Sequence, residues 1–211
     1  MSIAKEVENY IKQKPSVRDC LQKDLVNFSS LSRQITADLK LSKTSDFDAI
    51  LVACRRYAEK MKAIEDYEGK IMKLLKGSKL EIKNKISTII LDDRVGMHRL
   101  MGIAKQIAEA GSEFHVIQGT STITIITTDE FFQKLKHQFR DFVIAEQRDV
   151  VMLTIITSKE IEKIPGVLAY LTSFFAENGI NIYEAMSAWT DTILTIEEKD
   201  VPKAMEILKF G

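Results

Sequence analysis

An internal repeat in the last two thirds of the chain constrains its fold more than any other feature. Thr88-Ile89-Ile90 recurs as Thr154-Ile155-Ile156, and Gly111 recurs as Gly179. A third match pairs Thr124-Ile125-Ile126 with Leu194-Thr195-Ile196. The offset between the copies is roughly 65 to 71 residues, which indicates a duplicated structural unit and not a chance periodicity. The sequence therefore predicts two similar modules in tandem.

Each copy alternates β-rich runs with amphipathic helical segments in the order βαββαβ. The first copy has predicted strands at 86–91, 113–117, 122–127 and 142–145, with helices at 97–110 and 129–139. The second has strands at 151–157, 181–188 and 192–197, with helices at 165–177 and 201–209. Only Phe210 and Gly211 follow. We therefore expect the second copy's last strand to be short or absent, with an open edge that favours pairing with another copy.

Residues 1–77 are expected to form an all-α domain. Apolar residues at helical spacing predict helices at 2–13, 17–25 and 31–39, with Ser30 as the cap of the third. A fourth run, from Phe47 to Leu75, keeps alternating steps of three and four residues and predicts one long linker helix. Its apolar seam can pair with the same helix of a second chain or pack on the following domain. The fold class is thus α+β, with domains at 1–77, 78–148 and 149–211.

The composition is that of a globular protein, with 45% hydrophobic and 28% charged residues, nine Gly and three Pro. No apolar run approaches the ~20 residues needed to span a bilayer, and Glu6 and Glu8 are atypical of a targeting segment. We therefore expect a cytoplasmic protein. Cys20 and Cys54 have no metal-ligand spacing, and the three histidines are scattered, so we expect no metal and no cofactor.

Part of the repeat resembles the ACT domain, in particular the regulatory tandem of aspartokinases. The residues that carry the resemblance are Ile164-Pro165-Gly166-Val167-Leu168-Ala169, then Phe175-Ala176-Glu177-Asn178-Gly179 followed by Ile180-Asn181-Ile182. The first copy is similar but looser, with Asp92-Asp93-Arg94-Val95-Gly96-Met97 at the matching loop. The likeness spans 79–211. It implies a domain that binds an amino acid or similar small metabolite between paired modules and transmits the event to an attached domain.

The resemblance also implies which residues contact the ligand, at the loop after the first strand and the start of the next helix. They are Asp92, Asp93, Gly96 and Met97 in the first copy, and Ile164, Pro165, Gly166, Val167, Asn181 and Ile182 in the second. Glycine permits close approach, a helix N-terminus offers N–H groups to a carboxylate, and an Asp can pair with an ammonium. Capping of the following helix by the two aspartates is the alternative. His98 and Arg99 depart from the family's small residues, which puts the first site in doubt.

The helical domain resembles a helix-turn-helix, with 30–35 as positioning helix and 48–57 as recognition helix. Arg33, Lys43, Arg55 and Arg56 are the candidate contacts to duplex DNA, and a solvated helix face is the alternative for them. The first 77 residues carry a charge of +4, which permits such a partner but does not require it. Asp46 and Asp48 at the start of the candidate recognition helix would weaken contact with phosphates.

Catalysis has no support in the sequence. There is no glycine-rich phosphate loop, no spacing typical of a nucleophile with its base, and no paired carboxylates in an expected cleft. We therefore expect no enzyme and no catalytic residue. The first hypothesis is an amino-acid-sensing regulator of transcription that acts as a homodimer. The alternatives are a regulatory subunit that binds a biosynthetic enzyme in trans, and a dimerisation scaffold without a ligand.

Overall fold

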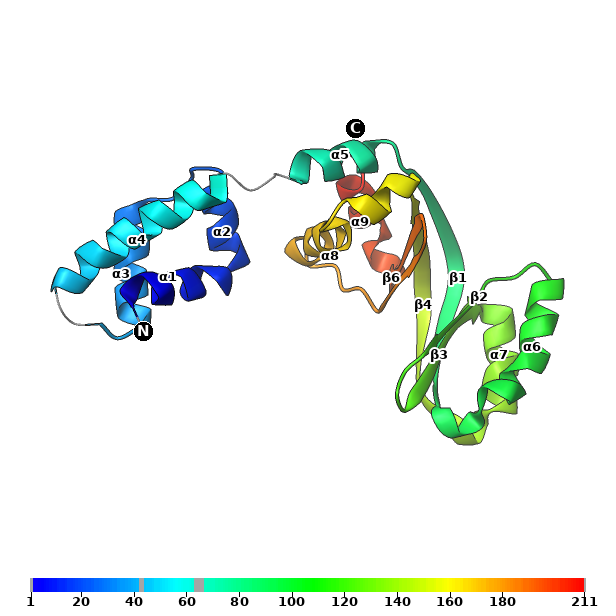
Figure 1. Cartoon of the computed structure of the whole chain (residues 1–211). Helices are drawn as coiled ribbons and strands as arrows, with labels where there is room; N and C mark the ends of the chain where they lie inside the picture. Colours follow the sequence, from blue (N-terminus) through cyan, green and yellow to red (C-terminus); the bar gives the residue numbers. More distant parts are fainter. Residues whose placement is uncertain (1, 42–43, 63–66, 211) are drawn as a thin grey trace. The chain divides into compact units, whose positions relative to one another are not determined.

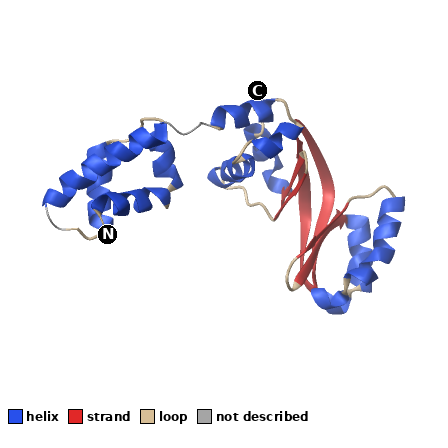
Figure 2. Cartoon of the chain, viewed as in Figure 1, coloured by secondary structure: helices blue, strands red, loops and turns tan. Residues whose placement is uncertain are grey.

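A computed structural model describes residues 2–41, 44–62 and 67–210 (Figure 1). The chain divides into two compact units, Met1–Asp66 and Tyr67–Gly211. The first contains only helices among its described residues, and the second contains the whole sheet with further helices (Figure 2). Each unit is described by itself.

The described residues of the first unit form four helices around one core. They are α1 (Ile3–Lys12), α2 (Pro15–Gln22), α3 (Phe28–Asp38) and α4 (Thr44–Lys62). Their inward faces bury Val7, Ile11, Leu21, Leu31, Ile35, Ile50, Cys54, Tyr57 and Met61. The bounds of two helices differ from the expectation. α2 lies at Pro15–Gln22 where 17–25 was expected, and α3 begins at Phe28 because Asn27 caps it, its side chain accepting from the Ser30 N–H at 3.0 Å. Ser30, expected to be the cap, lies inside the helix.

The long linker helix expected between Phe47 and Leu75 is not continuous in the described residues. α4 ends at Lys62, and α5 (Glu68–Lys76) begins after Tyr67, which lies in neither helix. Ile64 of the expected apolar seam lies outside the described residues. The apolar residues of α5 do not form a dimer seam, because Ile71, Leu74 and Leu75 are buried in the core of the second unit. Packing on the following domain, one of the two alternatives, is therefore the observed role of α5.

The second unit is built on one six-stranded antiparallel sheet with the order β2-β3-β1-β4-β6-β5. Its strands are β1 (Lys79–Asp92), β2 (Phe114–Gln118), β3 (Thr122–Thr128), β4 (Val143–Ile156), β5 (Glu184–Ala188) and β6 (Asp191–Glu197). Its helices after α5 are α6 (Met97–Glu109), α7 (Asp129–Gln138), α8 (Val167–Glu177) and α9 (Val201–Ile207). Short 3-10 turns join several of these elements: η1 (Asp93–Val95), η2 (Arg140–Phe142), η3 (Lys159–Lys163) and η4 (Glu198–Asp200).

The two central strands, β1 and β4, run through both halves of the sheet. Residues 86–92 of β1 pair with β3, whereas residues 79–83 of the same strand pair with the second half of β4. The expected open edge beside the second repeat is therefore wrong. The place of its missing last strand is taken by the beginning of β1, a segment that the sequence analysis left outside any strand. The sheet has its free edges at β2 and β5 instead.

Each half of the sheet has its own core under its own helices. We call the first half, with 86–92, β2, β3, 143–147, α6 and α7, the first lobe. Its core is formed by Ile89, Leu91, Val95, Leu100, Ile103, Ile107, Ile123, Ile125, Phe131, Phe132 and Leu135. The second lobe contains 79–83, 150–156, β5, β6, α5, α8 and α9. Its core is formed by Ile71, Leu74, Leu75, Leu153, Ile155, Val167, Leu171, Phe175, Leu194 and Ile196.

A third, smaller cluster joins the helix-free faces of the two lobes. Ile86, Ile126, Met152 and Ile193 are all buried and in contact, and they come from four different strands of both lobes. These residues alternate along their strands with those that face the helices, so the cluster lies on the opposite face of the sheet. The sheet is curled, and these four residues join its two lobes on that face.

Candidate functional site: two loops, one of them in contact with a helix

The loop of the first lobe, between β1 and α6, is organised by an ion pair. The Asp92 carboxylate accepts from the Arg94 backbone N–H at 2.9 Å and from its guanidinium Nε and Nη2, both at 2.8 Å. These contacts with Arg94 lower the pKa of Asp92 to about 2. Asp92 thus caps the turn Asp93–Val95, and a ligand's ammonium would compete with Arg94 for the carboxylate. Asp93 is exposed and lies beside it.

Gly96 then turns the chain into α6. Its φ is +73°, a left-handed conformation that disfavours other residues, and a Cβ here would lie 2.8 Å from the His98 imidazole. Met97, the first residue of α6, is half-buried against the first lobe's core. The sequence reasoning therefore located a close approach at Gly96, but the group that approaches in the structure is His98 of the same chain.

The loop of the second lobe, before α8, is built around another left-handed glycine. Gly166 has a φ of +90° and accepts from the Tyr170 N–H through its carbonyl at 2.8 Å, which starts the helix. Val167 is buried in the second lobe's core, and Ile164 packs against that core. Pro165 and Gly166 remain exposed.

Helix α5 is in contact with this second loop and with the start of α8. A Cβ at Gly166 would be 3.7 Å from Cδ1 of Ile71, and the Tyr170 hydroxyl donates to the sulfur of Met72 at 3.0 Å. Ile71 is itself 5% exposed and shares the core with Val167. The loop expected to meet a ligand is therefore in contact with the helix that follows directly on the helical unit. No local sequence pattern indicates this contact, because it joins segments about 95 residues apart.

The structure brings together part of the predicted second site. Ile182, in the connection between α8 and β5, packs against the same core as Ile164 and Val167, while Asn181 is exposed. The two predicted loops do not meet within one chain. Asp92 and Ile156 lie at opposite ends of the shared pair β1–β4, and 14-residue strands at about 3.3 Å per residue extend over roughly 45 Å.

One residue near the second loop was missed by the sequence reasoning. Glu184, at the start of the edge strand β5, is half-buried, and burial raises its pKa. Its backbone N–H donates to Thr195 Oγ1 at 2.9 Å, but its carboxylate has no partner among the described residues. The alternation of side chains in β5 could have indicated this burial. Glu184 shares a face of the strand with Met186, which packs on the buried cluster between the lobes.

The candidate DNA contacts lie on the surface of the first unit. Arg33 of α3 and Arg55 and Arg56 of α4 are exposed, and Lys43 lies outside the described residues. Arg56 also borders a groove of about 170 Å³ in volume between α1 and α4. The groove is lined by Ala4, Glu8, Ala49, Val52, Ala53, Arg56, Tyr57 and Lys60. Val52 is 54% exposed there.

Within residues 2–41, 44–62 and 67–210 no three His, Cys, Asp or Glu side chains are grouped so that they could hold a metal ion. No helix of these residues is long and apolar enough to cross a membrane. Cys20 is exposed and Cys54 is buried, and this burial raises the pKa of the Cys54 thiol to about 11.

Comparison with known proteins bears on the second unit. A family model described as the ACT domain matches residues 146–209. Aspartate kinase of Clostridium acetobutylicum, described as an allosteric enzyme, superposes with a TM-score of 0.51 at 14% identity over 62% of this chain. The match takes up 33% of that enzyme, so this chain corresponds to about a third of its length. No curated protein sequence matches.

A second solved structure, the ligand-free regulatory subunit of aspartate kinase from Thermus thermophilus, is similar over 61% of this chain and 93% of its own. Its TM-score is 0.49 at 16% identity. Residues 146–209 thus match the ACT domain, and the curled antiparallel sheet with its helices has the fold seen in part of that aspartate kinase.

Proposed function

We propose that this chain is a non-catalytic regulator that senses an amino acid through its ACT region and signals through its helical unit. In this proposal the second unit comprises two ferredoxin-like ACT domains, 78–148 and 149–211, which exchange strands across β1 and β4. The strand orders support it: β2-β3-β1-β4 in one lobe and β5-β6-β4-β1 in the other are the same pattern. The helical domain, 1–77, contributes α5 as the link.

The observation that carries the proposal is the contact of α5 with the second loop and the start of α8. Ile71 and Met72 contact Gly166 and Tyr170, so any ligand that reorders this loop must change the packing of α5. A ligand shifts an equilibrium only by its different affinities for two states, and here the two states are α5 seated and α5 displaced. The helical unit is joined to α5 through the chain itself.

The first loop supplies the complementary chemistry for an amino acid. Asp93 is exposed beside Asp92, and its carboxylate suits an α-ammonium, while the N-terminus of α6 at Met97 suits an α-carboxylate. Because the two loops lie at opposite ends of the shared strands, a ligand held by both has to lie between two chains. We therefore propose a homodimer, with Pro165, Asn181 and Ile182 of one chain on the partner side of the ligand.

The output of the helical unit is proposed to be duplex DNA, contacted by Arg33, Lys43, Arg55 and Arg56 in a helix-turn-helix formed by α3 and α4. The support is that the three described arginines are exposed. A second candidate, docking on a biosynthetic enzyme, is favoured by exposed Val52 in the groove beside Arg56, because DNA has no need of an apolar surface. An affinity for DNA that falls steeply with salt supports the first, and co-purification of an enzyme supports the second.

Thermal unfolding of the full chain against each of the twenty amino acids tests the sensing function. A ligand that binds only the folded state at about 100 times its Kd adds about 2.7 kcal/mol of stability. For a chain of this length that corresponds to a rise in Tm of roughly 5 to 11 °C. We expect one or two amino acids to give such a rise. No rise with any of them would refute amino-acid sensing.

A further inference from the structure

The groove between α1 and α4 in the helical unit has small apolar side chains along its floor. Ala4 of α1 and Ala49 of α4 are exposed, and Val52 is 54% exposed beside them. Small side chains at a helix surface allow the axis of another helix to approach to about 8 Å. The volume of the groove, about 170 Å³, is enough for one leucine or phenylalanine side chain, because a cavity of about 150 Å³ holds benzene.

The rim of this groove carries more cations than anions. Arg56 and Lys60 lie on the groove side of α4, and Glu8 of α1 is the one acidic residue among the described residues that line it. Glu8 is already paired with Lys12 at 2.6 Å. That bond is the main cause of a lowered pKa at Glu8, and the nearby charges of Lys60 and Lys5 add to it. Arg56, Lys60 and Lys5 are exposed and form no ion pair within the described part of the chain.

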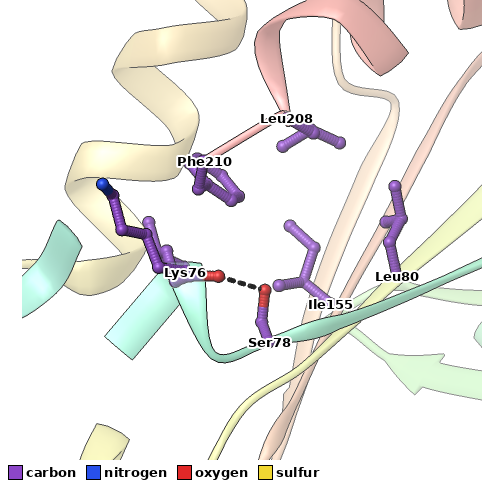
Figure 3. A pocket seen from close by; sticks show the side chains of 7 residues that line it. Lys76, Ser78, Leu80, Ile155, Leu208 and Phe210 are labelled. Atoms are coloured by element: carbon purple, nitrogen blue, oxygen red, sulfur yellow. Dashed lines mark hydrogen bonds between the residues drawn. The ribbon is translucent and has the colours of Figure 1, made fainter. Parts of the chain in front are cut away.

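The hollow in the second unit, between the end of α5 and the start of β1, has no comparable charge. The Ser78 hydroxyl there donates to the Leu75 carbonyl at 2.6 Å. Figure 3 shows this bond and the ammonium of Lys76 directed away from the hollow. Nothing at this place selects the charge of a partner, in contrast to the groove of the first unit.

We propose that the groove between α1 and α4 binds an acidic amphipathic helix of a partner protein, with an apolar side chain against Val52 and carboxylates at Arg56 and Lys60. The unpaired cations select an acidic partner. The small side chains between two flanking helices select a helix. Addition of a strand is excluded, because the described residues of the first unit contain no strand whose edge it could join. The inference rests on the second candidate function above, docking on a protein, and names the chemistry of the docked segment.

Duplex DNA would use the cations of the rim but not the floor. Its phosphates are neutralised by Lys and Arg side chains and leave an apolar floor uncovered, whereas a helix in the groove covers Ala4, Ala49 and Val52 as well. Arg55 separates the two partners. It is exposed on α4 and is a candidate DNA contact, but it does not line the groove.

The test uses the full chain and a synthetic helical peptide of about 14 residues, long enough at about 1.5 Å per residue to span Ala49 to Lys60. One face of the peptide carries leucines at steps of three and four residues, glutamates flank that face, and a staple holds the helix. Fluorescence anisotropy measures its affinity, and methyl resonances of Ala4, Ala49 and Val52 are expected to shift on titration. One control peptide has lysine for each glutamate, and another has alanine for each leucine. Both should bind at least about ten-fold more weakly.

Two pairs of variants locate the binding. Val52→Gln should weaken the glutamate peptide about ten-fold, because it places a polar amide against the leucines. Leu25→Gln, at an exposed apolar residue outside the groove, should not. Arg56→Gln combined with Lys60→Gln should weaken the peptide about four- to 25-fold, the product of two exposed ion pairs, and Arg55→Gln should leave its affinity unchanged. Tm values without peptide check that each variant is folded.

The outcomes separate this groove from the other proposals for the helical unit. Undiminished affinity in Val52→Gln, equal binding of the lysine peptide, or no binding of any peptide would refute the docking site. A mixed-sequence DNA duplex is titrated in parallel at several salt concentrations. DNA binding that is weakened by Arg55→Gln, without peptide binding, would refute the docking site and leave the DNA output standing. Peptide binding without DNA binding would support the groove and remove that output.

Discussion

Replacing Lys85 by glycine should stabilise this protein, although glycine within a strand normally destabilises. Lys85 lies at a register shift in β1 with a φ of +55°, in the left-handed region. That conformation costs a residue with a side chain about 1–2 kcal/mol, whereas the extra chain entropy of glycine costs about 0.5–1 kcal/mol. Lys85 is exposed and has no ion pair among the described residues, so no contact is lost. The midpoints of these two ranges differ by about 0.75 kcal/mol, which is the expected net gain.

Urea unfolding measures the gain as a rise in midpoint without a change in slope. The corresponding rise in Tm is about 1–4 °C. Asn84→Gly is the matched control, because Asn84 is the exposed neighbour without a positive φ, and this variant should lose about 0.5–1 kcal/mol. If Lys85→Gly loses as much stability as Asn84→Gly, the left-handed bulge at Lys85 is not part of the folded chain.

The bulge at Lys85 allows the single strand β1 to contribute side chains to the cores of both lobes. Leu80 faces the second lobe's core, while Ile89 and Leu91 face the first lobe's core. An even-numbered and an odd-numbered position can face helices on the same side of a strand only if one residue is inserted between them. The register shift between Lys83 and Ile86 supplies that residue.

Three further predictions concern individual side chains. Ellman's reagent should modify Cys20 in the native protein and Cys54 only after denaturation, and equally fast modification of both would contradict the burial of Cys54. Burial raises the pKa of Glu184, so its ionisation costs folding stability as pH rises above the ordinary pKa of a glutamate. Glu184→Gln should therefore raise Tm at pH 7 but not at pH 4, and equal effects at both pH values would be inconsistent with a buried carboxyl. Arg94→Ala should return the pKa of Asp92 from about 2 toward its ordinary value in a carboxyl NMR titration, and an unchanged pKa would mean that Arg94 is not its partner. The stability due to this pair is present above the ordinary pKa of Asp92 and is lost as pH falls toward 2.

The sequence predicted the order of helices and strands after Ser78 because alternation, helical periodicity and glycine stops are local signals. Helices α6 and α7 and strands β3 and β6 lie within one or two residues of their expected bounds. The sequence missed the first part of β1, because Lys79, Glu81 and Lys83 gave that segment a polar character. A pairing with β4 more than 60 residues away decides its structure, and no local pattern contains that information.

The candidate site was predictable only in its parts. The glycines at 96 and 166 were predicted from the family resemblance, and both have a positive φ. The helix over Gly166 could not be foreseen, because the seam of Ile71 and Leu75 is equally consistent with a dimer seam and with packing on a domain. For Asp92 the sequence is consistent with two roles, ligand contact and helix capping. In the structure its carboxylate accepts hydrogen bonds from the Arg94 guanidinium.

Hydrogen exchange of α5, with and without the amino acid that most raises Tm, tests the central claim most directly. We expect the amides of Glu68–Lys76 to change their protection together with those of the loop at Gly166, because Ile71 contacts Gly166 and Met72 contacts Tyr170 at the start of α8. The amides of α3 in the helical unit serve as the reference for direct effects of the ligand. An amino acid that stabilises the protein while α5 exchanges as before would contradict the account, because α5 would then not carry the signal.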